Sequence, residues 1–261
     1  MSITIKLPYH IGNYTIRCED ENINQIFREY YGVYCCDYDD GTIVINVEPE
    51  QWRWRIRVGC EEIYTNDPVQ TIHNILYSEK RIQHGLYALH AGAVCRNKKA
   101  VIFVAATNAG KTTLITFLTQ KGFEYVSDDC VFIDMKSNTV HACQTPIHLR
   151  KGGIEVLTRY NCLPEKLVYC DERYIFTPKN LSPSQMALGR ICFIERGTVN
   201  ETVVLPKAEV LNRLLVAPIV AYPLTGEYIR FLSHLIPFCS MLRYRDMDYV
   251  MEVFGNTFTN F

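Results

Sequence analysis

Lys111 is preceded by a glycine and followed by two threonines, Gly110-Lys111-Thr112-Thr113, after an apolar stretch, VIFVA, and a loop of small residues. Backbone N–H groups in such a loop can surround a phosphate, and the start of the next helix adds partial positive charge. The lysine reaches the β- and γ-phosphates, and the first threonine hydroxyl binds Mg²⁺. The pattern predicts a nucleotide-binding P-loop, against the plainer alternative of a loop that caps a helix. The expected nucleotide contacts are Thr107, Asn108, Ala109, Gly110, Lys111, Thr112 and Thr113.

One residue departs from the P-loop pattern GxxxxGK[ST], because Ala105 stands where the first glycine is expected. If this position required a positive φ, an alanine would cost on the order of 1 kcal/mol there. Such a cost would weaken phosphate binding without abolishing it. It also motivates an alternative, in which the protein binds a nucleotide as a regulator and does not turn it over.

Two adjacent carboxylates, Asp128 and Asp129, follow a short apolar segment downstream of the predicted P-loop. In a parallel sheet, the end of that strand faces the P-loop. One carboxylate can bind Mg²⁺ directly or through water, and the other can accept a proton from an attacking hydroxyl. Alone, the pair also fits a solvated turn. Beside a P-loop, we favour the catalytic interpretation.

His90 lies in the apolar run 86–94, just upstream of the P-loop strand. On these residues alone a core histidine with a hydrogen-bond partner is favoured. The small residues that come after it, Ala91, Gly92 and Ala93, allow another segment to approach the backbone closely.

The elements that position these residues begin near residue 86, where long apolar runs replace short ones. Gly122 suits the end of the helix that comes after the P-loop. The segments predicted after residue 85 are strands at 86–94, 101–105, 123–126, 131–135 and 241–245, a hairpin of 188–195 with 201–205, and helices at 112–121, within 205–217 and 219–236, and up to Phe254.

Residues 1–85 are predicted to form a small α/β module, because short apolar runs alternate with turn residues there. A turn is expected at 39–41, and Asp67 and Pro68 are suited to begin a helix. The predicted segments are strands at 3–7, 14–18, 42–47, 53–58 and 62–64, and helices at 21–31 and 69–82.

The composition narrows the class of protein. The 261 residues carry 27 Lys and Arg against 28 Asp and Glu, so we expect no broad basic surface for nucleic acid. Apolar stretches are too short for a bilayer, and no signal-peptide pattern opens the chain, so we expect no membrane contact. The 11 scattered cysteines include no CxxC pair, which favours reduced, mostly buried thiols and a cytoplasmic location.

His90, the loop 105–113 and the segment 127–129, in this order, resemble the kinase domain of the HPr kinase/phosphorylase family and its smaller relatives. Two looser similarities are the segment PIHLRKG at 146–152 and IPFCSMLRYR at 236–245. The resemblance covers about residues 86–254. It implies a P-loop kinase domain of the HPr kinase/phosphoenolpyruvate carboxykinase type over 86–261, with the small α/β module of 1–85 in front of it.

The resemblance also implies residue roles. Asp128 would be the proton acceptor, Asp129 and Thr112 would bind the metal, and His90 would lie near the γ-phosphate or orient an aspartate. Thr113 departs from the glutamate usual in true HPr kinases, and their signature loop is absent, which argues against HPr as the substrate. Arg150 and Lys151 are further phosphate or substrate contacts, although a surface role fits each as well.

The expected activity is transfer of the γ-phosphoryl group of ATP, with Mg²⁺, to a hydroxyl. The small relatives modify ribosomally made peptides, including lasso peptides, or free serine. A Ser or Thr of a precursor peptide or protein is therefore the first expectation for the acceptor, and a small metabolite such as free serine is the alternative. A nucleotide-binding regulator and a nucleotidyltransferase stay open, as does a homo-oligomer.

An aromatic group in the N-terminal module suits a peptide groove, although an ordinary core is favoured. Edge strands of the module could also pair with an extended peptide. The aromatic residues are Tyr30, Tyr31, Tyr34, Trp52 and Trp54.

Overall fold

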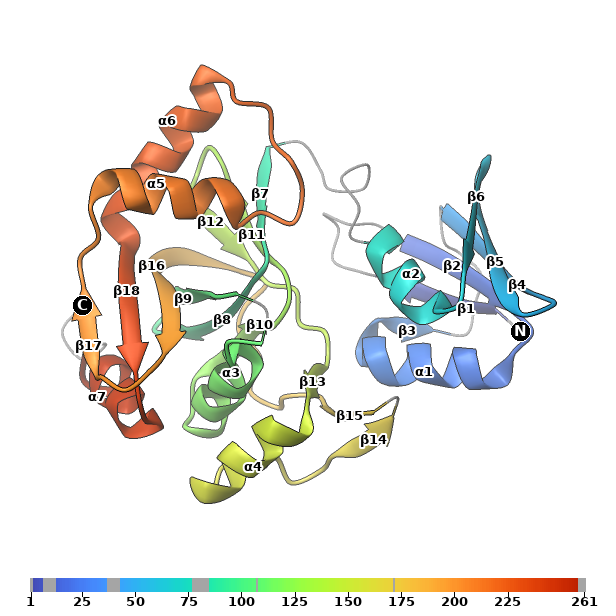
Figure 1. Cartoon of the computed structure of the whole chain (residues 1–261), viewed down its shortest axis with the longest axis horizontal. Helices are drawn as coiled ribbons and strands as arrows, with labels where there is room; N and C mark the ends of the chain where they lie inside the picture. The colour runs from blue at the N-terminus through green and yellow to red at the C-terminus, as the bar shows by residue number, and fades with distance from the viewer. Residues whose placement is uncertain are drawn as a thin grey trace.

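The computed structural model describes residues 2–6, 13–36, 43–76, 85–106, 108–170 and 172–257, and these form a mixed α/β fold with three sheets (Figure 1). Within this part of the chain, no helix is long and apolar enough to cross a membrane. None of the 11 cysteines forms a disulfide, and most are buried, as the sequence predicted.

The N-terminal sheet has six strands in the order β3-β1-β2-β4-β5-β6, and two helices belong to the same segment. The strands β2 and β4 run parallel, and the other neighbours run antiparallel. The elements are β1 (Ser2–Lys6), β2 (Asn13–Cys18), α1 (Glu21–Tyr31), β3 (Cys35–Cys36), β4 (Ile43–Glu50), β5 (Arg53–Val58), β6 (Glu61–Thr65) and α2 (Pro68–Leu76).

The central sheet has nine strands and holds Lys99–Val104, the strand that precedes the Lys111 loop, in its interior. Its main order is β10-β8-β9-β16-β12-β11-β7, and β18 pairs with β16 and β17. The strands are β7 (Leu86–Leu89), β8 (Ala91–Arg96), β9 (Lys99–Val104), β10 (Glu124–Ser127), β11 (Val131–Asp134), β12 (Thr139–His141), β16 (Gln185–Arg196), β17 (Glu201–Val203) and β18 (Cys239–Tyr244).

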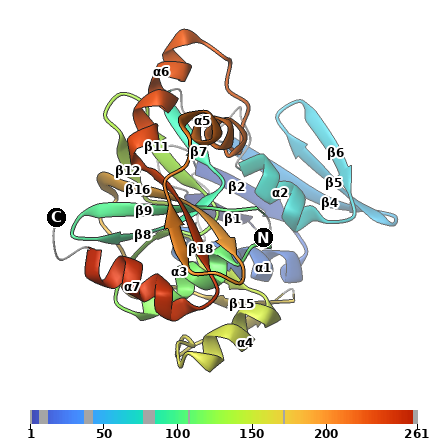
Figure 2. The ribbon, with the colours of Figure 1, turned by 60° about the vertical axis from the view of Figure 1, so that its left-hand side comes forward.

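Helices cover both faces of the central sheet, as Figures 1 and 2 show from two directions. One face carries α5 and α6, and the other carries α3 and α7, with α4 and a three-stranded sheet beside α3. These elements are α3 (Lys111–Gln120), β13 (Ile147–Leu149), α4 (Lys151–Arg159), β14 (Val168–Cys170), β15 (Arg173–Phe176), α5 (Lys207–Val216), α6 (Gly226–Leu235) and α7 (Met247–Thr257).

Side chains of β9 pack against helices on both faces of the central sheet, which explains why both faces of the strand are apolar. Ile102 and Val104 pack towards α5 and α6, whereas Val101 and Phe103 pack towards α3 and α7. Successive side chains of a strand point to opposite faces, so a strand covered on both sides needs an unbroken apolar run. The same requirement explains the apolar residues of β16.

The edge of the central sheet at β7 and β11 joins the N-terminal module. Tyr87 and Leu89 pack into the core below α5 and α6, whereas Leu86 and Ala88 pack into the core of the N-terminal sheet. Phe132 of β11 joins them there. The predicted division near residue 85 therefore falls where one strand serves two hydrophobic cores.

Three sequence expectations need correction. The run 86–94 is two strands, because His90 lies between β7 and β8. The segments 188–195 and 201–205 form no hairpin, because β16 runs parallel to β9 and β18, and β17 pairs with β18. The sheet is mixed, because β8 lies antiparallel between β9 and β10. The ends of β9 and β10 still share one edge, because two antiparallel steps restore the direction.

Several N-terminal elements agree closely with expectation, such as α1 at Glu21–Tyr31 and β5 at Arg53–Val58. The turn expected at 39–41 and the end of the helix expected at 69–82 lie outside the described residues. The sequence did not predict the three-stranded sheet or α4.

Gly92 on β8 is the close-approach position that the small residues after His90 suggested. A Cβ at this glycine would lie 2.6 Å from Cγ1 of Ile115 on α3 and 3.3 Å from the carbonyl oxygen of Asp128. We expect Gly92→Ala to lower the free energy of unfolding by about 1–3 kcal/mol, because overfilling a close-packed core forces neighbours apart. Denaturant unfolding measures the change. The control Gly197→Ala, with open space around its Cβ, should stay close to wild type; equal stabilities of the two variants would contradict the prediction.

Candidate active site

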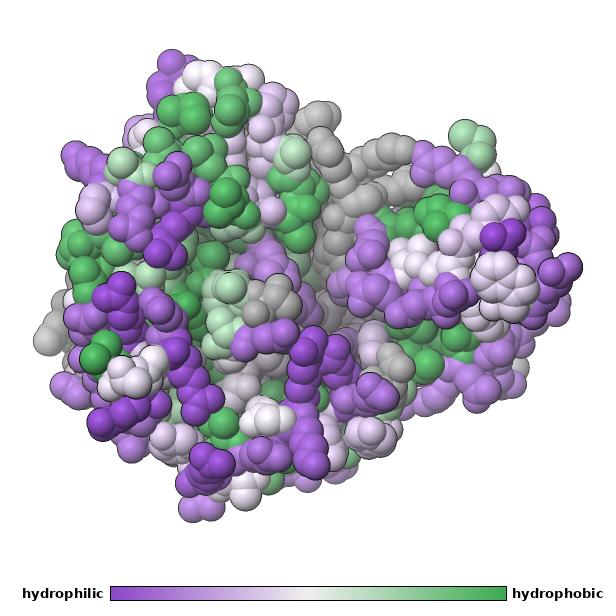
Figure 3. All heavy atoms as spheres, in the orientation of Figure 1, coloured by the Kyte–Doolittle hydropathy of each residue, from purple (hydrophilic) through white to green (hydrophobic). Residues whose placement is uncertain are grey.

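A cleft of about 1300 Å³ runs between the end of β9 and the N-terminal module. The surface view shows a hollow between the two parts, with hydrophilic residues on both sides (Figure 3). One wall carries the loop before α3 and the aspartate pair, and the opposite wall carries residues of α1 and α2. The cleft therefore brings together segments of the N-terminal module and segments around the central sheet.

The loop between β9 and α3 has the strand–loop–helix setting that the sequence predicted. Gly110 has a φ of 89° as the residue before α3, and Asn108 has a φ of 67°. Glycine adopts this region freely, and asparagine tolerates it better than most residues. Ala105 is not among the described residues with positive φ, so its methyl group causes no backbone strain. This removes the reason for expecting a weakened loop.

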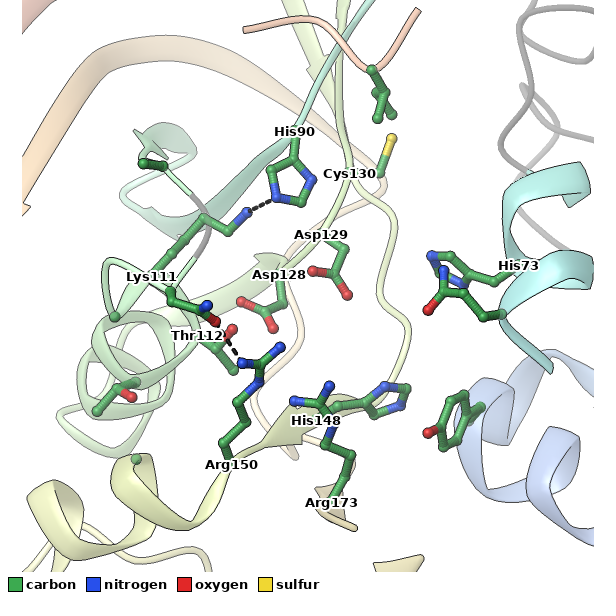
Figure 4. Close-up of a pocket in the computed structure, with 18 of the residues that line it drawn as sticks. His73, His90, Lys111, Thr112, Asp128, Asp129, Cys130, His148, Arg150 and Arg173 are labelled. Atoms are coloured by element: carbon green, nitrogen blue, oxygen red, sulfur yellow. Dashed lines mark hydrogen bonds between the residues drawn. The ribbon is translucent and has the colours of Figure 1, made fainter. Parts of the chain in front are cut away.

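Lys111 begins α3 and is only 7% exposed, so its ammonium is held at the wall of the cleft. It donates a hydrogen bond to Nε2 of His90 at 3.0 Å (Figure 4). Burial, followed by the charge of Lys111, lowers the pKa of His90, so its imidazole is neutral at neutral pH and can accept this bond. His90 is therefore a partner of Lys111 at the cleft rather than an isolated core histidine.

Asp128 and Asp129 lie where β10 ends, across from Lys111 and Thr112 (Figure 4). Asp128 is 2% exposed, and its Oδ1 is buried without a hydrogen-bond partner. Burial and the neighbouring charge of Asp129 raise the pKa of Asp128 to about 8, against the opposing effects of Lys111 and the Thr112 hydroxyl. A carboxyl group in this environment is poised to exchange a proton near neutral pH.

The raised pKa of Asp128 predicts how the ligand-free protein responds to pH. The folded state holds a proton that the unfolded state releases near pH 4, so stability falls as pH rises from about 4 to about 8. For one group the loss is at most about 1.4 kcal/mol per pH unit. Asp128→Asn has no titrating carboxyl group at this position. The unfolding free energy of the variant minus that of wild type should therefore increase as pH rises. A difference that stays constant across this range contradicts the prediction.

The remaining predicted contacts divide between the cleft and the surface. Arg150, which precedes α4, lines the cleft and donates to Oδ1 of Asn108 at 2.6 Å. Thr113 lines the cleft as well. Lys151 is exposed and is not among the described lining residues, and neither is Ala109. The predicted contact Thr107 lies outside the described residues.

The wall opposite the aspartates contains residues that sequence analysis did not select. The ring of His148 on β13 packs against the ring of Tyr30 on α1, with centroids 4.3 Å apart and planes tilted by 43°. Arg173 of β15 lies beside His148 (Figure 4). His73 of α2 faces the same space and shares a 3.0 Å hydrogen bond with the Tyr31 hydroxyl. His148 lies in the segment 146–152 that carried the looser similarity, but no local pattern marked Arg173 or His73.

The aromatic group of the N-terminal module does not form one groove. Tyr30 lines the cleft, Tyr31 lies in the core, and Tyr34 and Trp54 pack against that core. Trp52 is 72% exposed beside Arg53. The favoured expectation of an ordinary core holds for most of the group.

Oxygen ligands for a hard cation are present where the loop meets the aspartates. The hydroxyl of Thr112 and the two carboxylates face one part of the cleft. Among the described residues no group of three or more His, Cys, Asp or Glu is arranged around a common metal position. This donor set fits Mg²⁺, which typically takes one or two carboxylates and completes its shell with water and phosphate.

Comparison with known proteins adds one finding. No family model and no curated protein matches this chain. Among solved structures, the HPr(Ser) kinase/phosphatase from Coxiella burnetii is similar, with 12% identity and a TM-score of 0.29. The match covers 66% of this chain and 95% of that chain. A likeness at this TM-score establishes neither fold nor activity, so the function has to be inferred from the residues of the cleft.

Proposed function

We propose that this protein is a P-loop phosphotransferase that moves the γ-phosphoryl group of ATP to a hydroxyl. The observation that carries this proposal is the meeting of Lys111 and Thr112 with the Asp128–Asp129 pair at one wall of a large cleft, where Asp128 keeps a buried, unpartnered carboxyl oxygen. A lysine and a proton acceptor on opposite sides of a phosphate are the groups that phosphoryl transfer requires.

The phosphates of ATP bind at the start of α3. Backbone N–H groups of the loop and the helix terminus attract the anion, and Lys111 supplies a point charge. Arg150, tied to the loop through Asn108, adds a second cation above the phosphates. Lys111 must then leave His90 or share its protons between the imidazole and the phosphate. His90 thus holds the lysine ready at the cleft before nucleotide arrives.

In the transfer step the acceptor oxygen forms a bond to the γ-phosphorus, and the bond from that phosphorus to the β-phosphate oxygen breaks. The proton of the acceptor hydroxyl goes to Asp128, whose raised pKa makes its carboxylate a stronger base than an ordinary aspartate. Lys111 offsets negative charge on the transferring group. ADP leaves with the negative charge that the broken bond deposits on it.

Thr112 and Asp129 are the residues that would hold Mg²⁺, since both lie at the cleft and offer oxygen atoms. Bound Mg²⁺ supplies charge neutralisation for the β- and γ-phosphates. The acceptor enters from the side of the N-terminal module. A Ser or Thr hydroxyl of a peptide or protein is the first candidate, and a small hydroxylated metabolite such as free serine is the second.

The test supplies the purified protein with Mg²⁺, an extract of the native host and ATP, labelled in the γ-phosphate in one reaction and in the α-phosphate in another. Label from γ-labelled ATP on a peptide or metabolite, with about 80 Da added, supports a kinase; label from α-labelled ATP with about 329 Da added identifies nucleotidyl transfer instead. ATP binding with no transferred label from either position would overturn the proposal in favour of a nucleotide-binding regulator. The size of the labelled product distinguishes the two acceptor classes.

A further inference from the structure

The cleft is larger than its proposed nucleotide requires. Ligand pockets typically enclose about 300–1,000 Å³, whereas this cleft encloses about 1300 Å³. The nucleotide phosphates account for the wall with Lys111 and Arg150. The space that remains lies towards the N-terminal module. It is bounded by Tyr30 and by Arg173, His148 and His73 (Figure 4). We call these four residues the distal subsite.

Arg173 is the cation of the distal subsite. It comes from β15, which pairs with β13 so that Ile175 lies opposite His148, and this pairing places Arg173 beside the imidazole. None of the ion pairs found between described residues involves Arg173. Its neighbour Glu172 also lines the cleft but is exposed. A guanidinium in a concave site is suited to a planar, two-point contact with a carboxylate or phosphate.

Arg150 and Arg173, two of the arginines that line the cleft, have different partners. Arg150 is bound to Asn108 in the nucleotide loop at 2.6 Å, so it belongs with the phosphates of ATP. Arg173 lies beside His148 and, together with burial, its charge helps to lower the pKa of that imidazole. The distal subsite therefore has a cation that is separate from those assigned to the nucleotide.

His148 supplies a second recognition group. Its Nε2 is buried and has no hydrogen-bond partner, and its ring is fixed against Tyr30. Burial lowers the pKa of His148, so the ring is neutral at neutral pH. A buried polar nitrogen left unpaired is costly, and a ligand group that pairs with it is correspondingly favoured.

We infer that the distal subsite binds an anionic group of the acceptor, a carboxylate or a phosphate, through Arg173, with Nε2 of His148 accepting a hydrogen bond from an N–H or O–H group beside that anion. This inference rests on the proposed function, since it describes the second substrate of the same site. The acceptor is then a hydroxyl compound that carries its own negative charge. The hydroxyl lies towards Asp128, and the anionic group lies towards the N-terminal module.

The test measures anion binding directly. The protein is loaded with Mg²⁺ and a non-hydrolysable ATP analogue, AMP-PNP, to fill the nucleotide loop, and is titrated by calorimetry with inorganic phosphate and, separately, with malonate. A parallel titration is made without nucleotide. We expect at least one anion to bind the loaded protein, and Arg173→Gln to weaken that binding at least tenfold with AMP-PNP affinity unchanged. The preferred anion tells phosphate recognition from carboxylate recognition.

A matched control distinguishes anion binding at Arg173 from nonspecific attraction of the anion to positively charged side chains. Arg159→Gln removes an exposed arginine of α4 outside the cleft and should bind the anion as wild type does. The unfolding midpoint of each variant reports whether it is folded. If Arg173→Gln does not fold, Arg173→Lys is tested in its place. The inference is overturned if the loaded wild type binds neither anion, or if the Arg173 variants bind the anion as tightly as wild type.

Phosphoryl transfer distinguishes failure of this inference from failure of the proposed function. Arg173-dependent anion binding without transfer in the extract would retain the distal subsite and reject the kinase. Transfer that is equally fast in wild type and Arg173→Gln would retain the kinase and reject the distal subsite as the acceptor site.

Discussion

Asp128→Asn is expected to lower the rate of phosphoryl transfer by about 10²–10⁴-fold, the range typical of a lost general base. The asparagine amide has nearly the same shape as the carboxyl group but cannot take the proton of the acceptor hydroxyl. The nucleotide is held by the loop and by Lys111, so its affinity should stay within a few-fold of wild type. Transfer of γ-label measures the first quantity, and calorimetry with AMP-PNP measures the second.

A matched control and a pH profile make this expectation specific. Asp248→Asn removes an exposed carboxylate in the first turn of α7 and should leave transfer unchanged. In wild type the rate should rise with pH as Asp128 loses its proton, because only the carboxylate acts as a base. Normal turnover by Asp128→Asn would show that another group takes the proton.

Lys111→Met is expected to reduce both nucleotide affinity and turnover. Loss of a charged hydrogen-bond donor to phosphate costs about 1.5–3 kcal/mol, which corresponds to about 10- to 150-fold in affinity. Loss of electrostatic stabilisation in the transfer step lowers the rate further, by about 10²–10³-fold. Calorimetry and single-turnover transfer at saturating ATP measure the two effects separately.

The control for this variant lies on the same helix. Lys121→Met removes an exposed lysine that comes after the last turn of α3, far along the helix from the loop. It should bind nucleotide as wild type does. If Lys111→Met binds AMP-PNP as tightly as Lys121→Met, the loop before α3 is not the phosphate site.

The contrast between His90 and Arg173 shows which residues of the cleft could be predicted from the sequence. His90 precedes β9 by one strand, so its contact with Lys111 arises from neighbouring segments of one sheet. Arg173 reaches the cleft through β15 of a separate three-stranded sheet that the sequence did not predict. The strands of this sheet have only three or four residues, so the alternation of apolar and polar side chains is too short to predict them.

The segments 188–195 and 201–205, which were predicted to pair as a hairpin, illustrate a different limit. Proximity along the chain favoured a hairpin, but β16 fills the space between β9 and β12 and also pairs with β18. Burial on both faces of a central strand outweighs the short loop that would close a hairpin. Such a choice depends on distant strands, which local patterns do not identify.

By itself the sequence determined the strand, loop and helix around Lys111 and the aspartate pair after β10, because each depends on residue types and backbone preferences within a few positions. Only the tertiary structure decided that α1, α2 and β15 form the opposite wall of the cleft. It also decided that Asp128 is buried beside Asp129 with a raised pKa. Both outcomes depend on burial and on charges brought together from distant segments, and those are properties of the folded chain.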